Sequence, residues 1–107
     1  MQEDADYNQR QYQRILDRID LYRSGRMSLP TLIADVEGLI SALQGVSPEW
    51  RNTLLGAWGP LEVIYSVALY EHRNALDDED RMAISEALDN LERTIKTHGP
   101  GSNSLVN

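Results

Sequence analysis

Histidine is the side chain best suited to acid-base or metal chemistry near neutral pH, and the chain has two, His72 and His98. No His-x-x-x-His pair occurs, and no carboxylate pair brackets either histidine at the spacing of metal ligands. The chain contains no cysteine, so disulfides and thiolate metal sites are excluded. We therefore predict no catalytic residue, no metal ligand and no cofactor.

Carboxylates are the other candidates for chemistry. The run Asp77-Asp78-Glu79-Asp80 lacks the alternating ligands, central glycine and distal glutamate of a calcium loop. Acids in the first turn of a helix are explained by the helix dipole. Asp35 and Glu37 are two residues apart, so on a helix they point to different sides. No Glu-x-x-His di-iron motif and no glycine-rich phosphate loop is present. The sequence predicts a binding protein rather than an enzyme.

The net charge of -7 indicates the kind of partner. Residues 1–26 carry five acids and five bases, residues 27–76 five acids and two bases, and residues 77–107 seven acids and three bases. Such a chain is repelled by nucleic acid and by anionic membranes, and it attracts basic proteins. Solubility alone is the other interpretation of this charge.

The hydrophobic periodicity is helical along the whole chain, and no segment alternates at period two. We expect an all-α, single-domain antiparallel bundle of four long helices plus one short helix, with a helical domain over residues 1–97 and a flexible C-terminal tail over residues 98–107. Ser28 and Ser47, each followed by an early proline, are predicted N-caps. The helices are predicted at about 5–24, 28–44, 47–58 (the short one), 61–74 and 77–97.

Three finer expectations follow from particular residues. Gly59-Pro60 should break or kink the chain between the third and fourth helices. The segment 61–74 is apolar nearly all round, which is typical of a central, buried helix. The second helix carries only small residues opposite its Leu/Ile/Val stripe, so we expect another helix to pack there; these residues are Thr31, Ala34, Gly38, Ser41 and Ala42.

Several strings of the sequence resemble small helical immunity proteins of bacterial polymorphic toxin systems, including contact-dependent growth inhibition systems. The resemblance covers roughly residues 12–95. It is carried by Met27-Ser28-Leu29, by Leu32-Ile33-Ala34-Asp35-Val36-Glu37-Gly38-Leu39, by Glu49-Trp50, and by Trp58 with Leu61-Glu62-Val63-Ile64-Tyr65. Pro60 departs from the pattern.

The resemblance implies a function: such proteins bind one toxin domain, often a nuclease, and block it in a one-to-one complex. An acidic inhibitor is suited to cover the basic surface of a nuclease. The residues that we predict to contact the toxin are the acids Asp35, Glu37, Asp77, Asp78, Asp80, Glu86 and Asp89, with Tyr70 as an aromatic anchor.

Two other functions remain open at this point. The small residues of the second helix could serve a self-associating helical adaptor. A small metal-dependent enzyme would need Glu62, Tyr65 and His72 to converge. The acidic N-terminus is unlike a signal peptide, and no run approaches the about 20 apolar residues of a membrane span, so we expect a cytoplasmic location.

Overall fold

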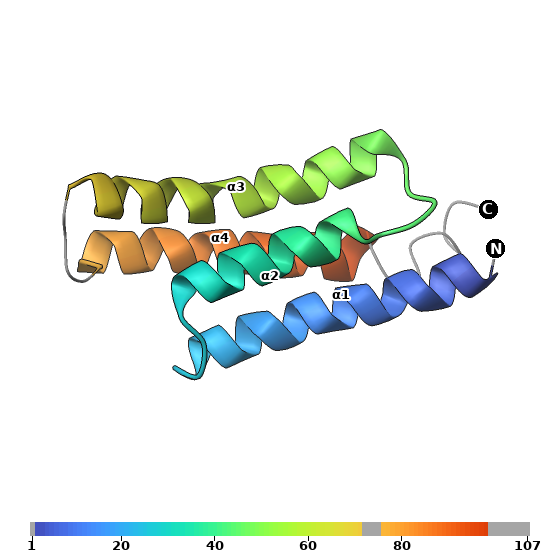
Figure 1. Ribbon diagram of the computed structural model, residues 1–107, viewed down its shortest axis with the longest axis horizontal. Coiled ribbons are helices and arrows are strands. Elements are labelled where there is room, and N and C mark those ends of the chain that lie inside the picture. The colour runs from blue at the N-terminus through green and yellow to red at the C-terminus, as the bar shows by residue number, and fades with distance from the viewer. Residues whose placement is uncertain (1, 72–75, 99–107) are drawn as a thin grey trace.

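The protein folds into four helices that run up and down in an antiparallel arrangement (Figure 1). The structure is a computed structural model and describes residues 2–71 and 76–98. Each helix packs mainly against its neighbour in the chain, and α1 and α4 touch least. The α3–α4 hairpin ends beyond the ends of α1 and α2 (Figure 1). The helices are α1 (Gln2–Arg23), α2 (Leu29–Ser41), α3 (Pro48–Tyr70) and α4 (Asp78–His98).

The connections between the first three helices follow the turn and capping residues in the sequence. Gly25 adopts a φ of 80° after α1, a left-handed conformation that glycine tolerates without strain. The Ser28 hydroxyl accepts a hydrogen bond from the Thr31 N–H at 3.4 Å, and that of Ser47 accepts one from the Trp50 N–H at 3.1 Å. Both predicted N-caps are therefore confirmed.

One helix replaces the two that were predicted on either side of Gly59-Pro60. The all-α class and the antiparallel bundle are confirmed, but the short third helix is wrong because α3 continues through Pro60. Pro60 and Gly56 are both exposed, so the Gly56 carbonyl that loses its N–H partner remains open to water. Leu54, Trp58 and Leu61 are buried on both sides of the proline and hold the helix to the core.

The core is built from the apolar stripes of all four helices. Its fully enclosed side chains are Ile15, Ile19, Leu32, Val36, Ile40, Leu54, Leu61, Ile84, Leu88, Leu91 and Ile95. Burying one such side chain contributes about 1.5–3 kcal/mol. The Leu/Ile/Val stripe predicted for the second helix is the face of α2 that packs here.

Buried polar contacts tie the helices together at defined positions. Trp58 of α3 donates from Nε1 to the Ile33 carbonyl of α2 at 3.0 Å. The Asn8 side chain brackets the main chain of Gln44, donating to its carbonyl at 2.6 Å and accepting from its N–H at 2.9 Å. These contacts fix α2 against α3, and α1 against the loop before α3.

Two expectations about buried faces are wrong. Thr31, Ala34, Gly38 and Ser41 of α2 are exposed, so no helix in the described part of the chain covers the small face. The segment 61–70 is not buried all round, since Val63 is 60% exposed. A bundle of four helices has no central position, so each helix keeps one face towards water. The expected tail over 98–107 lies outside the described residues, apart from its first residue at the end of α4.

Candidate protein-binding surface

Large exposed hydrophobic side chains gather on the second half of α3 and the start of α4. Tyr70 is 86% exposed and Val63 is 60% exposed. Exposed apolar patches on small proteins often mark sites of protein contact. The described residues of this kind are Val63, Val67, Leu69, Tyr70 and Met82.

Three of these side chains belong to a single stripe on α3. Gly56, Pro60, Val63, Val67 and Tyr70 follow one another at intervals of four, three, four and three residues, so they share one side of the helix. All five are exposed, and they lie opposite the buried residues of α3. We call this stripe the α3 outer face. It carries no charge, whereas the solvent side of a helix usually holds charged residues.

Acidic residues border the α3 outer face. Glu49 precedes the stripe, Glu71 follows it and Glu62 flanks it, and all three are exposed. The only base in α2 and α3 is Arg51. Its guanidinium donates to the main-chain carbonyls of Ile40 and Leu43 at 2.6 and 2.8 Å, so Arg51 caps the C-terminal end of α2. Among the described residues, Glu49 and Glu62 therefore make the border of the stripe acidic.

Four of the predicted contact residues lie together at the end of the α3–α4 hairpin. Tyr70 ends α3, and Asp77, Asp78 and Asp80 begin α4. Asp77 and Asp80 cap this helix reciprocally: the Asp80 N–H donates to Asp77 Oδ1 at 2.8 Å, and the Asp77 N–H donates to Asp80 Oδ2 at 3.2 Å. Asp78 pairs with Arg81 at 3.3 Å. The helix-start interpretation of this acidic run is thus supported by its hydrogen bonds.

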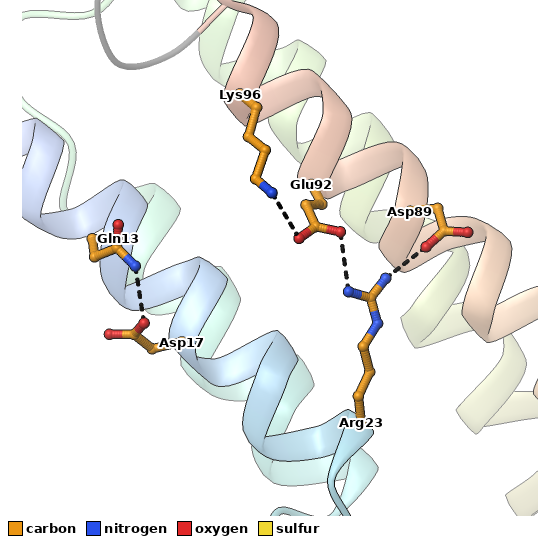
Figure 2. A network of polar contacts seen from close by, with 6 residues as sticks. All are labelled: Gln13, Asp17, Arg23, Asp89, Glu92 and Lys96. Carbon is orange, nitrogen blue, oxygen red and sulfur yellow. Dashed lines mark hydrogen bonds and ion pairs between the residues drawn. The ribbon is translucent and has the colours of Figure 1, made fainter.

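Two other predicted contact residues form ion pairs within the bundle. Asp35 accepts from Arg18 Nε at 3.1 Å, which joins α2 to α1. Asp89 accepts from Arg23 Nη2 at 2.6 Å, and Arg23 Nη1 also reaches Glu92 at 3.0 Å (Figure 2). Figure 2 shows the Arg23 side chain extending from the end of α1 towards α4, where Lys96 holds the other oxygen of Glu92. Asp35 and Asp89 therefore already have a role in holding helices together.

Glu37 on α2 and Glu86 on α4 complete the predicted set, and both are exposed. The structure thus spreads the eight residues over α2, α4 and the hairpin end rather than gathering them on one surface. Sequence reasoning missed Val63, Val67, Leu69 and Met82. Gly56 and Pro60, which disfavour a helix interior, were a signal that this side of α3 is not packed.

The shifted pKa values of two groups reflect the packing of the bundle. Burial raises the pKa of the Tyr12 hydroxyl, although a 2.8 Å hydrogen bond from Trp50 Nε1 partly opposes this. The hydrogen bond from Arg23 lowers the pKa of Glu92; burial opposes this shift and Lys96 adds to it.

The metal-enzyme alternative gains no support from the described side chains. Among them no three His, Asp or Glu residues are grouped closely enough to hold a metal ion. Glu62 is exposed and Tyr65 is half-buried, and His72 lies outside the described residues. No helix in the described part of the chain has the length and apolarity needed to cross a bilayer.

Comparison with known proteins leaves the chain without an assigned relative. No family model matches it, and no curated protein or solved structure does so either.

Proposed function

We propose that this chain is an immunity protein that binds and neutralises a cognate bacterial toxin domain. The partner is a basic enzyme, a nuclease of a contact-dependent inhibition system, whose active-site or substrate-binding surface the acidic bundle covers. The observation that carries the proposal is the excess of negative over positive charge on α2 and α3. These helices hold four acids, Asp35, Glu37, Glu49 and Glu62, of which Asp35 pairs with Arg18 of α1, while their single base is hydrogen-bonded to main-chain carbonyls.

A negatively charged surface of this kind attracts a basic protein and speeds its association. A nuclease is basic where it binds its substrate, since the phosphate backbone supplies most of the binding energy. The resemblance of residues 12–95 to small helical immunity proteins supports the same function. The proposal places the protein in the cytoplasm, where a delivered toxin would act.

The experiment is a neutralisation assay with the toxin domain encoded beside this chain. Cells that express the domain should grow only when this chain is co-expressed, and the purified pair should form a one-to-one complex. Absence of both rescue and complex would show that the proposal is wrong. So would turnover of a substrate by the purified chain alone.

The charge contribution is tested with a triple variant, Glu37→Gln, Glu62→Gln and Glu86→Gln, on exposed sites of α2, α3 and α4. Its association rate should fall by about tenfold at low salt, and the salt dependence should become shallower because fewer charges steer the encounter. The control changes Asp6, Asp17 and Asp20 of α1 to Asn, which alters the net charge equally. A similar loss in both variants would show that net charge matters rather than the particular acids of α2, α3 and α4.

A self-associating adaptor is the second candidate, because the small face of α2 is exposed. It predicts a stable dimer in sedimentation equilibrium that Ala34→Glu abolishes. The immunity function predicts a monomer when the toxin is absent.

A further inference from the structure

We infer that the α3 outer face is the docking surface for the partner, and that the partner presents an apolar contact area bordered by Lys and Arg. This inference rests on the proposed function for the identity of the partner. It adds the place of contact, which the acidic residues alone do not define. It also assigns the central contacts to Val63, Val67 and Tyr70, of which only Tyr70 was predicted from the sequence.

The stripe has the dimensions of a helix-sized contact. Gly56 and Tyr70 are 14 residues apart, which corresponds to about 21 Å along the helix. Val63 and Val67 stand at its centre and Tyr70 at its end, so the large side chains occupy one half of the stripe. Aromatic side chains next to apolar area are frequent sources of binding energy.

The other half of the stripe consists of residues that the fold does not require. A Cβ built on Gly56 would meet no atom within 4 Å, so the packing of the bundle gives no reason for a glycine. Glycine and proline both destabilise a helix interior. Gly56 has no side chain and Pro60 has only its ring, so a partner can approach the α3 backbone closely along this half of the stripe.

Charge distinguishes a basic partner from a second copy of this chain. In a twofold dimer through the α3 outer face, the helices would cross with Glu62 of both copies beside the contact, and their acidic borders would meet. Like charges across an interface oppose association. A partner with Lys or Arg around its apolar area is attracted by the same border.

The exposed small face of α2 is a weaker docking surface than the α3 outer face. Thr31, Ala34, Gly38 and Ser41 offer no large side chain that could fill a pocket of a partner. The α3 outer face offers three large exposed side chains, Val63, Val67 and Tyr70.

The test uses the full chain and the purified toxin domain encoded beside it. The variant is Val63→Lys with Val67→Lys, which places two positive charges within the stripe. Its control is Gln9→Lys with Gln13→Lys, which has the same charge change and spacing on the exposed side of α1. The control should bind as the wild type does, whereas the α3 variant should bind at least 100-fold more weakly and fail to protect cells. Tyr70→Ala should weaken binding about 30-fold, the loss typical of an interface anchor.

Circular dichroism melts verify that the variants fold, and Val63→Ala with Val67→Ala is a milder substitute if the lysines unfold the bundle. Binding by a folded α3 variant at wild-type strength would overturn the docking surface while leaving the proposed function intact. Failure of the wild type to bind the toxin domain would refute the proposed function itself. A wild-type dimer that the lysines dissociate would assign the face to a second copy and overturn the inferred partner.

Discussion

The indole N–H of Trp58 donates a 3.0 Å hydrogen bond to the main-chain carbonyl of Ile33, from the interior of α3 to the interior of α2. A carbonyl in the middle of a helix already accepts a hydrogen bond within the helix, so the indole is a second donor that links the Trp58 side chain to the backbone of α2. The contact fixes the register of α2 along α3. It thereby also fixes where Glu37 of α2 lies relative to the α3 outer face.

Removal of this donor should weaken the bundle. Trp58→Phe keeps an aromatic ring but loses the hydrogen bond and some volume, so the free energy of unfolding should fall by about 1–2 kcal/mol. Urea denaturation provides the measurement. Trp50→Phe is the comparison: it also removes an indole donor, to the Tyr12 hydroxyl, but the Trp50 ring is only partly buried, so the loss should be smaller. Equal losses in the two variants would contradict a special role for the Trp58–Ile33 bond.

Asn8 offers a test with a pH dependence. Asn8→Asp keeps the acceptor for the Gln44 N–H but places a carboxylate oxygen against the Gln44 carbonyl, so stability should fall by about 1–3 kcal/mol at neutral pH. The repulsion raises the pKa of the new carboxyl in the folded state. The loss should therefore shrink as the pH falls through that raised pKa, because the protonated acid can donate again.

Urea titrations of Asn8→Asp between acidic and neutral pH measure this effect, and Gln9→Glu on the exposed side of α1 provides the control. A loss of stability that stays constant over this range would contradict the prediction.

The ion pair between α1 and α4 predicts a second pH effect. Since Arg23 lowers the pKa of Glu92 from its usual value of 4.5, the pair stabilises the fold above that value. This contribution is lost as the pH falls through the lower pKa of the folded state. Arg23→Gln should reduce stability by about 0.5–1 kcal/mol at neutral pH, a small amount because the groups are partly exposed.

Two measurements check the Arg23 prediction. An NMR titration should show the Glu92 pKa rising in Arg23→Gln, and the stabilities of the two proteins should converge at low pH. An unchanged Glu92 pKa would contradict the pairing.

Pro60 costs the helix stability. Alanine at this position would restore an N–H donor to the Gly56 carbonyl and remove the ring, so Pro60→Ala should raise the free energy of unfolding by about 1–3 kcal/mol. Proline also restricts the unfolded chain, and its replacement by alanine raises the entropy of the unfolded state. This effect reduces the gain in the free energy of unfolding by about 0.4–1 kcal/mol. Thermal melts provide the measurement. Pro30→Ala, in the first turn of α2 where proline is tolerated, should change stability little.

Local signals in the sequence predicted the parts of the fold that depend on local chemistry. Ser28 and Ser47 cap their helices through their own hydroxyls, and Asp77 to Asp80 begin α4 through their own carboxylates. The Leu/Ile/Val stripe of α2 predicted its buried face because an amphipathic helix must bury its apolar side. Of the residues on the α3 outer face, Tyr70 alone is also a contact residue that we predict from the sequence.

The missed features depend on what the rest of the chain places beside a residue. Pro60 removes one main-chain hydrogen bond of α3, but burial of Trp58 and Leu61 holds both halves of the helix against the core. A local sequence pattern does not reveal this burial. Val63 and Val67 have the residue type of a core, yet they are exposed because no other helix in the described part of the chain packs against this side of α3. The small face of α2 was misjudged for the same reason.

The up-and-down order of the helices also bears on how quickly the chain folds. Because α1 packs on α2, α2 on α3, and α3 on α4, most contacts close short loops, and proteins with such local contacts fold within microseconds to milliseconds. The seam between the first and last helices joins residues such as Arg23 and Asp89, which are far apart in the sequence. Of the packed helix pairs, α1 and α4 lose the most chain entropy when they associate and gain the fewest contacts. This seam should therefore form last during folding and open first when the native state fluctuates.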